Sequence, residues 1–332
     1  MEKVINFSHE SDIDGLGAVI VAMLAFENVD YVLMPDANKL EETFRDYLIK
    51  SRLDGYDYVF VTDLALYQPA VSMVNSDEKL NKKVFVFDHH KASIDRGLDK
   101  YDFCTIFETD EAGRKTCGTE LYYNFLKEKN MIEETKALST FVEYTRLEDN
   151  WLWKNEGKRG ENAHSLAVLL SSCGKEEYIT RMFSKLKEEK DSFSLNEEET
   201  KIVEDKKKEY KEKIVSILNE AEIFVDGSNN RYMAVFAPYE YRNELAEYII
   251  ENGNNEDVKY IIIIALDKGE YGQKSYRSIC KDFDVNCVAI SHGGGGHISA
   301  AAVNITKEQN AQALSMDKKE ALKYLSESIY TK

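Results

Sequence analysis

Histidines and aspartates recur in this sequence directly after short runs of apolar residues. Three such runs occupy residues 4–7, 58–61 and 84–87. The polar residues that follow them are His9, Asp12, Asp14, Asp63, Asp88, His89 and His90. Carboxylates crowded in this way would repel one another and raise each other's pKa unless cations held them together. This ligand set suits two adjacent divalent ions better than one, such as Mn²⁺, with Mg²⁺, Co²⁺ or Fe²⁺ as substitutes.

The apolar runs are typical of buried parallel strands, because they are unbroken and rich in valine and phenylalanine. Helix-like segments near 16–26 and 39–50 follow the first run, and further strands are expected near 31–34 and 101–107. This alternation predicts an α/β domain with a doubly wound, mostly parallel sheet. Ligands bind at the carboxyl ends of such strands. The strand ends would therefore bring the histidines and aspartates to one edge of the sheet.

The middle of the sequence, from about 134 to 220, predicts helices. Both tryptophans of the chain lie there, in Glu148-Asp149-Asn150-Trp151-Leu152-Trp153. A Lys- and Glu-rich stretch carries an apolar stripe at helical spacing, and a capping box at Asn196–Glu199, or at Ser194–Glu197, would start this helix. We expect it to connect two domains. The predicted organisation is a metal-binding domain at 1–190, a helical connector at 191–222 and a smaller α/β domain at 223–332.

The smaller domain contains a run of four glycines, Gly293–Gly296, flanked by His292 and His297. Strands are expected near 223–226, 232–236, 259–266 and 273–279, with a helix near 241–250. Four glycines inside a helix or strand would cost conformational entropy. They are favoured where backbone N–H groups approach an anion, and the small residues after them predict a helix whose positive end would help. A flexible turn is the simpler alternative.

Composition narrows the class of protein. The 332 residues are 43% hydrophobic and 31% charged, with a net charge of −17, as in ordinary globular proteins. An acidic surface disfavours proteins that track along long duplex nucleic acid. No apolar run is long enough to cross a membrane, and Met1-Glu2-Lys3 leads straight into strand-like sequence, so we expect a cytoplasmic protein without a membrane partner. The five cysteines predict reduced, mostly buried thiols.

Taken together, these motifs resemble those of the DHH/DHHA1 phosphoesterase family. The matching segments, in the family's order, are His9-Glu10-Ser11-Asp12-Ile13-Asp14-Gly15, Val61-Thr62-Asp63, Asp88-His89-His90, Cys117-Gly118-Thr119-Glu120, Asp149 and Gly293 to His297. Each motif is weak alone, but their order is specific and spans nearly the whole chain. The opening segment and the stretch from Asp149 to Trp153 look most like the nanoRNase B (NrnB) branch, whose members degrade short RNA oligonucleotides.

The resemblance implies roles for the individual residues. His9 and Asp12 would ligate one metal ion, and Asp14, His89 and Asp149 the other, with Asp63 between the two. Asp88 would orient a histidine, and His90 would contact the substrate phosphate. In the smaller domain the family's substrate-holding elements match Arg277, His292, Gly294, Gly295, Gly296 and His297. Many members have three residues between the first histidine and the next aspartate. Here there are only Glu10 and Ser11, so Glu10 is an alternative ligand.

The resemblance implies a two-metal phosphodiesterase. A water bridging two ions would attack the phosphate in line and release mononucleotides from short single-stranded RNA. Relatives of this architecture also cleave cyclic dinucleotides, 3′-phosphoadenosine 5′-phosphate and pyrophosphate, so these remain alternatives. A pyrophosphatase would be expected to have a Lys/Arg-dense C-terminal site, and the sequence around Arg277 is not dense in cations. A non-catalytic nucleotide-binding protein is a remote alternative. The sequence leaves the oligomeric state open.

Overall fold

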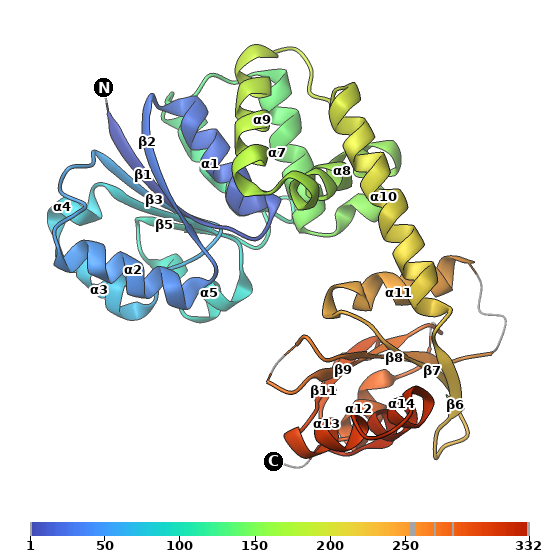
Figure 1. Ribbon diagram of the computed structural model, residues 1–332. Coiled ribbons are helices and arrows are strands. Elements are labelled where there is room, and N and C mark those ends of the chain that lie inside the picture. The colour runs from blue at the N-terminus through green and yellow to red at the C-terminus, as the bar shows by residue number, and fades with distance from the viewer. Residues whose placement is uncertain (1, 253–256, 269, 281, 331–332) are drawn as a thin grey trace. The chain divides into compact units, whose positions relative to one another are not determined.

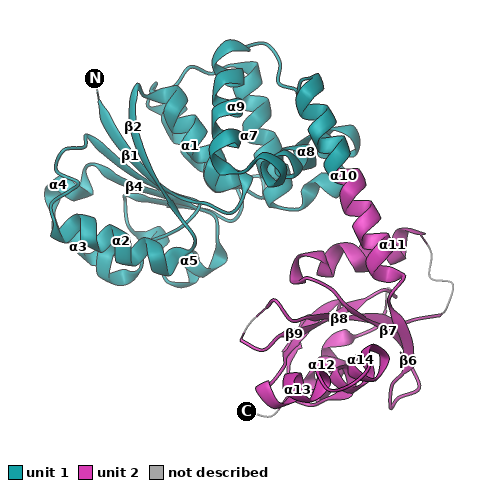
Figure 2. Ribbon diagram, in the orientation of Figure 1, with its two compact units in different colours: residues 1–206 teal, residues 207–332 magenta. Residues whose placement is uncertain are grey.

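The computed structural model describes residues 2–252, 257–268, 270–280 and 282–330. The chain divides into two compact units, residues 1–206 (unit 1) and residues 207–332 (unit 2) (Figure 2). The division falls inside helix α10 (Glu197–Leu218). The capping box that starts this helix is the one at Asn196, whose side chain accepts the amide of Glu199 while Glu199 accepts the amide of Asn196.

Unit 1 begins with alternating strands and helices, as the sequence predicts. Its strands are β1 (Lys3–His9), β2 (Asn28–Met34), β3 (Tyr58–Thr62), β4 (Val84–Asp88) and β5 (Cys104–Ile106). Between and after them lie α1 (Ile13–Ala25), α2 (Ala37–Ile49), α3 (Gln68–Ser76), α4 (Glu78–Asn81), α5 (Lys91–Asp95) and α6 (Gly118–Glu128). The strand after β4 is shorter than predicted and begins at Cys104.

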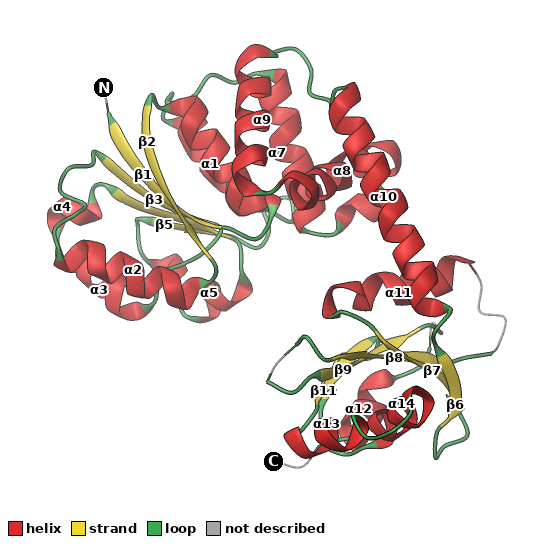
Figure 3. Ribbon diagram, viewed as in Figure 1, coloured by secondary structure: helices red, strands yellow, loops and turns green. Residues whose placement is uncertain are grey.

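The five strands form one fully parallel sheet in the order β2-β1-β3-β4-β5. Alternate residues along each strand face opposite sides, so that Val59 and Phe60, for example, join two different hydrophobic cores. Helices α2 and α3 cover one face, and α1 and α6 cover the other (Figures 1 and 3). The predicted doubly wound α/β sheet is therefore confirmed.

The rest of unit 1 is helical and packs on the α1 side of the sheet. It comprises α7 (Lys136–Asp149), α8 (Gly157–Cys173), α9 (Lys175–Glu188) and the first half of α10. Phe141 of α7 and Leu166 of α8 are fully buried in the same core as α1. The carboxyl end of α7 is Asp149, so this packing also brings Asp149 toward the sheet edge.

Unit 2 is a second α/β layer structure. Its strands are β6 (Glu222–Val225), β7 (Arg231–Phe236), β8 (Tyr260–Ala265), β9 (Gln273–Ser278), β10 (Gly295–Gly296) and β11 (Ala300–Asn304). They form a mixed sheet in the order β10-β11-β9-β8-β7-β6. Helix α11 (Arg242–Asn252) covers one face, and the other is covered by α12 (Val285–Ser291), α13 (Lys307–Ala313) and α14 (Lys318–Glu327) (Figure 3).

Two sequence predictions are wrong. The glycine run does not start a helix: it follows α12, and residues 300–304 form strand β11, which pairs with β9. Long-range pairing therefore overrides the helix propensity of the alanines in this segment. The cysteines are unpaired, but Cys117 is the only one of the five that is fully buried.

No helix among the described residues has the length and apolar character needed to cross a membrane.

Candidate metal centre

The histidines and aspartates of unit 1 meet at the carboxyl edge of the parallel sheet. His9 ends β1, Asp63 directly follows β3, and Asp88 ends β4. These three strands are neighbours in the sheet, and the strand order reverses between β1 and β3. Such a reversal leaves a crevice at the strand ends because the following loops run in opposite directions.

One potential ligand group combines His9, Asp12 and Asp63. The Nδ1 atom of His9 lies 2.7 Å from an Asp12 oxygen and 3.3 Å from an Asp63 oxygen. The carboxylates of Asp12 and Asp63 raise the pKa of His9 to about 10. Asp12 also begins α1, where its second oxygen accepts the amide of Gly15 at 3.0 Å. The N-cap thus fixes the direction of the Asp12 carboxylate.

A second group combines His89, Asp14 and Asp149. Nε2 of His89 lies 3.8 Å from an Asp14 oxygen and 3.5 Å from an Asp149 oxygen. The same nitrogen lies 3.4 Å from the other oxygen of Asp63. Asp63 therefore touches both groups, one oxygen toward His9 and the other toward His89. A third arrangement of Asp63, His89 and His90 also has metal-ligand spacing.

Asp14 is held in place by the start of α6. Its two oxygens accept the backbone amides of Gly118 and Thr119, each at 2.7 Å, and Asp14 is completely buried. Amides at the first turn of a helix point outward with their partial positive charge, so they favour an anion at this position. The segment Cys117-Gly118-Thr119-Glu120 thereby acts on the metal centre through Asp14.

Gly118 also allows Asp63 to lie where it does. A Cβ atom at Gly118 would come within 2.8 Å of both the Cα and the amide nitrogen of Asp63. Asp63 itself has a φ of 56°, in the left-handed region, and is 1% exposed. Strained backbone of this kind persists only where the surroundings enforce it, and it clusters at functional sites.

Three buried polar atoms at the centre form no hydrogen bond of good geometry among the described residues, although nearby groups lie at ion-pair distance from them. They are Nδ1 of His9, Oδ2 of Asp63 and Nε2 of His89. Burial and the charge of Asp14 raise the pKa of Asp63 well above its ordinary value. Buried polar groups without partners cost free energy, and a cation between His9, Asp63 and His89 would satisfy all three atoms. The residues present therefore fit divalent metal ions.

His90 lies beside this centre and is oriented by Asp88. Nδ1 of His90 contacts an Asp88 oxygen at 2.7 Å, and the other Asp88 oxygen accepts the hydroxyl of Ser93. Although burial opposes it, the contact with His90 lowers the pKa of Asp88, and the same contact raises the pKa of His90. About half of the His90 side chain is exposed. A fixed, partly exposed imidazole can donate a proton or a hydrogen bond to a ligand.

The predicted substrate-holding residues all lie in unit 2. Arg277, on β9, donates from Nε to Asn243 at 2.9 Å and from Nη1 to the Tyr276 carbonyl at 2.9 Å. Its strand partner on β11 is Ala300, which exchanges backbone hydrogen bonds with His297, so Arg277 and His297 lie at the same end of these strands. The carbonyl of His292 accepts the amide of Tyr330 at 2.8 Å.

The glycine run is packed closely against its neighbours. A Cβ atom at Gly294 would lie 2.1 Å from the carbonyl oxygen of Ala302, and Gly296 has a φ of 159° at the edge strand β10. The amide of Gly296 donates to the side chain of Asn286 at 2.8 Å. Gly295, by contrast, has almost open space around it. The loop is therefore an ordered edge of the sheet and not a flexible turn.

Most of unit 1 matches a known protein family. The family model "DHH family, N-terminal domain" matches residues 3–144. The chain is also 29% identical over 306 residues to the oligoribonuclease NrnB of Bacillus subtilis (strain 168), covering 91% of this chain and 73% of that protein. The resemblance inferred from the sequence motifs is thus confirmed.

Two solved structures are similar to this chain in fold. The pGpG-specific phosphodiesterase PggH from Vibrio cholerae is similar over 98% of this chain and all of that one, with a TM-score of 0.54 and 11% identity. A DHH-domain structure, described as a member of a family of ribosomal proteins, matches over 97% of this chain and 87% of its own, with a TM-score of 0.55 and 14% identity.

Sequence reasoning missed two features of unit 1. Trp153 stacks on His164 with ring centroids 4.0 Å apart, and His164 contacts Glu148 at 3.1 Å. The histidine is 11 residues beyond Trp153 and belongs to no motif, so no local signal pointed to it. Glu10, considered as a stand-in ligand, instead pairs with Lys175 at 2.8 Å and belongs to none of the potential ligand groups.

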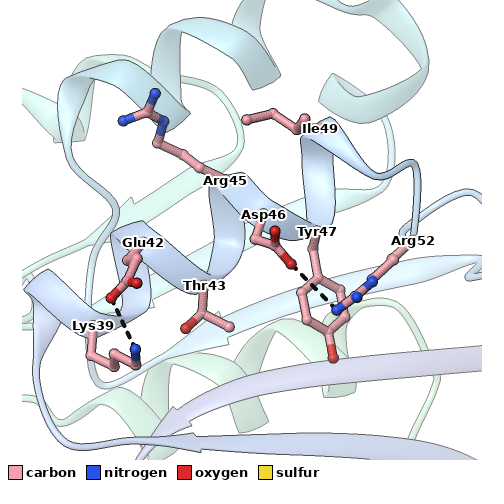
Figure 4. Close-up of a pocket in the computed structure, with 8 residues that line it drawn as sticks. All are labelled: Lys39, Glu42, Thr43, Arg45, Asp46, Tyr47, Ile49 and Arg52. Atoms are coloured by element: carbon pink, nitrogen blue, oxygen red, sulfur yellow. Dashed lines mark hydrogen bonds and ion pairs between the residues drawn. The ribbon is translucent and has the colours of Figure 1, made fainter.

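The larger of two described surface pockets lies on unit 1, away from the candidate metal centre. It has a volume of about 470 Å³ and lies along α2 (Figure 4). Its lining residues are Lys39, Glu42, Thr43, Arg45, Asp46, Tyr47, Ile49 and Arg52. Lys39 pairs with Glu42, and Asp46 pairs with Arg52 (Figure 4). Since these charges satisfy one another, the groove is a solvated helix face, and it contains none of the metal-centre residues.

The crowded carboxylates predict how stability depends on pH when metal is removed. Burial and the charge of Asp14 raise the pKa of Asp149 from 3.8 to about 8. The folded protein then holds a proton that the unfolded chain loses near pH 4. Stability should therefore fall as the pH rises toward 8 and level off above that value. We expect the melting temperature of chelated protein to decrease from pH 6 to pH 9, and a divalent metal ion to restore it, most strongly at pH 9.

The matched variant for this measurement is Asp149→Asn, which cannot ionise. Its melting temperature in chelator should depend less on pH than that of the wild type. A wild-type melting temperature that rises between pH 6 and pH 9 would contradict the raised pKa of Asp149.

Proposed function

We propose that this DHH protein is a two-metal phosphodiesterase that hydrolyses short RNA oligonucleotides to mononucleotides. The observation that carries the proposal is that Asp63 lies between two groups of potential ligands, 3.3 Å from Nδ1 of His9 and 3.4 Å from Nε2 of His89. We assign His9 and Asp12 to one ion and Asp14, His89 and Asp149 to the other. Carboxylate-rich sites of this kind suit Mn²⁺, with Mg²⁺, Co²⁺ or Fe²⁺ as substitutes.

The metal ions would supply charge stabilisation and an activated water nucleophile when bound. The surrounding side chains hold the ligands in position and contact the substrate. Asp14, fixed by two amides of α6, and Asp12, fixed at the start of α1, hold their carboxylates without reorganisation. His90, oriented by Asp88, offers a hydrogen bond to a phosphate oxygen. Arg277 and the loop from His292 to His297 would hold the nucleotide.

Trp151 is the residue best suited to stack on a base. It is 55% exposed, has a φ of 58° and lies two residues after Asp149. The ring of Trp153 is already stacked on His164, whereas the ring of Trp151 is contacted by the flexible side chain of Lys154, with Nζ 5.0 Å from the ring centre. Stacking on an exposed aromatic ring is tolerant of base identity. This feature favours a substrate with nucleobases over pyrophosphate.

The substrate is tested by Mn²⁺-dependent hydrolysis of an end-labelled RNA series from dinucleotides to about twenty nucleotides. Because the chain is similar to an oligoribonuclease over 91% of its length, we expect the shortest RNAs to disappear fastest. The acidic chain should bind long strands less well, since it has little basic surface to follow the backbone. His89→Ala, which removes a ligand from one group, should abolish the activity.

The same assay includes single-stranded DNA, a cyclic dinucleotide, 3′-phosphoadenosine 5′-phosphate and pyrophosphate. Hydrolysis of a cyclic or mononucleotide substrate in place of RNA would keep the metal centre and replace the proposed substrate. Bound metal without hydrolysis of any of these compounds would favour a nucleotide-binding protein without catalysis.

A further inference from the structure

A short chain of hydrogen bonds runs from the surface of unit 1 to His90. Arg96, which directly follows α5, donates from Nη2 to the hydroxyl of Ser93 at 3.0 Å. That hydroxyl donates to one oxygen of Asp88, and the other Asp88 oxygen contacts Nδ1 of His90 at 2.7 Å. Arg96 is exposed, whereas Ser93 and Asp88 are each 1% exposed. The chain therefore links a surface cation to the imidazole beside the metal centre.

The guanidinium of Arg96 is held by more than its contact with Ser93. Its Nε donates to the carbonyl of Ala92 at 3.1 Å, and the Arg96 amide donates to the same carbonyl at 3.3 Å. Its central carbon lies 4.5 Å from the centre of the Tyr67 ring, where the ring face attracts a cation. Tyr67 begins α3, and its amide donates to Glu41 at 2.9 Å. The guanidinium is thus fixed in its direction relative to Ser93.

This contact fixes the direction of the Ser93 hydroxyl. A serine hydroxyl can donate one hydrogen bond and can also accept, whereas a guanidinium can only donate. Arg96 therefore uses a lone pair of the Ser93 oxygen and leaves the hydroxyl hydrogen for Asp88. Without Arg96 the hydroxyl could turn away, and a buried oxygen of Asp88 would lose its donor, which costs free energy.

Ser93 also keeps Arg96 from taking the place of His90. Within the described ranges no direct ion pair joins Arg96 to Asp88, because the serine lies between them. A guanidinium directly on Asp88 would bind both carboxylate oxygens in its fork, and would compete with the imidazole for one of them. The serine transmits the interaction to one oxygen and leaves the other for Nδ1 of His90. Nε2 is then the nitrogen of His90 that is available to a ligand.

We propose that Ser93 and Arg96 are positioning residues for His90, which they hold through Asp88 so that Nε2 is directed toward the substrate phosphate. This inference rests on the proposed function and adds to it two residues outside the ligand groups. A donor assists catalysis most when it is already in place as charge develops on the phosphate. Loss of the chain should therefore lower kcat and change KM little.

The first measurement is steady-state, Mn²⁺-dependent hydrolysis of an RNA dinucleotide by the full-length protein. Arg96→Ala and, separately, Ser93→Ala should lower kcat about tenfold, as loss of an orienting partner typically does, and should change KM less than about twofold. The matched control is Arg52→Ala. Arg52 also lies on a tyrosine ring, 5.4 Å from the centre of Tyr47, and pairs with Asp46 of α2, and its loss should leave both constants unchanged.

A double-mutant cycle tests whether Arg96 acts through His90. In the His90→Ala background, Arg96→Ala should change kcat less than about twofold, because the imidazole that it positions is already gone. An equal loss of kcat in both backgrounds would overturn the inference. So would an increase in KM without a decrease in kcat, since Arg96 would then bind the substrate itself.

Nuclear magnetic resonance of metal-free, full-length protein tests the chain without hydrolysis. Since a carboxylate only accepts, Nδ1 of His90 carries the proton toward Asp88. This proton should give a signal downfield of the backbone amides that is absent in His90→Gln. We expect Ser93→Ala and Arg96→Ala to broaden the signal or shift it upfield, and Arg52→Ala to leave it unchanged.

The two kinds of measurement separate the positioning chain from the proposed function. A downfield signal that is missing from the wild type, or unchanged in both chain variants, would overturn the inference even if RNA is hydrolysed, and the proposed function would then stand without it. If the signal responds as expected but the wild type hydrolyses no RNA, the chain holds His90 and the proposed function falls.

Discussion

Asp63→Asn is expected to lower kcat for short RNA about a thousandfold and to reduce the number of bound metal ions. Asp63 contacts a histidine of each ligand group, and a neutral amide cannot offset two divalent charges. Losing several kcal/mol of metal-dependent stabilisation corresponds to this factor. Asparagine is the suitable replacement because it tolerates the left-handed backbone at this position. Activity is measured by hydrolysis of an RNA dinucleotide, and bound metal by mass spectrometry.

The same variant should not unfold the protein. The pKa of Asp63 is raised by burial and by Asp14, so removing the charge relieves repulsion in the metal-free state. We therefore expect a melting temperature in chelator at or above that of the wild type. Asp46→Asn, which changes an exposed carboxylate on α2, is the control for activity. Wild-type turnover in Asp63→Asn would remove the shared carboxylate from the mechanism.

Gly118→Ala is expected to impair both stability and activity. The new Cβ would lie 2.8 Å from the backbone of Asp63, and no rotation of a side chain can relieve contact with backbone atoms. Overpacking of this kind costs about 1–3 kcal/mol. Because the amide of Gly118 also holds Asp14, both ligand groups should shift, and misplacement by about 1 Å costs about a hundredfold in rate. Urea unfolding and RNA hydrolysis measure the two effects.

Gly55→Ala is the matched control, since nothing lies within 4 Å of a Cβ at Gly55. It should leave hydrolysis unchanged and unfold at a similar urea concentration. If Gly118→Ala behaves like Gly55→Ala, then the close approach between α6 and Asp63 is not needed to build the site.

The sequence was sufficient to predict the sheet and its carboxyl edge. Buried parallel strands such as β3 and β4 must be apolar on both faces, and this leaves an unbroken run that ends visibly at Asp63 and Asp88. Since parallel strands present the same ends to one edge, their terminal residues could be grouped without knowing the strand order. Asp149 was different: its place rests on the packing of α7, and the sequence pointed to it through the family resemblance.

Local sequence was misleading where long-range pairing decides the structure. Residues 300–302 are alanines, which favour helices, yet they form the strand β11 because β9 pairs with one of its edges. The glycines before them are needed for close approach, as at Gly294, and not for a helix start.

The hydrogen bond between Asp14 and Gly118 joins residues 104 positions apart, and this has a consequence for the chain while it is being made. At about 5–20 residues per second, translation needs roughly 5 to 20 seconds to cover that distance. During this interval the aspartates and histidine of β1 and α1 have emerged without their partners. A nascent chain that ends before α7 lacks Asp149 as well. By this account the proposed catalytic centre cannot form on the ribosome until nearly half of the polypeptide has been synthesised, so the messenger RNA beside it would meet an inactive protein.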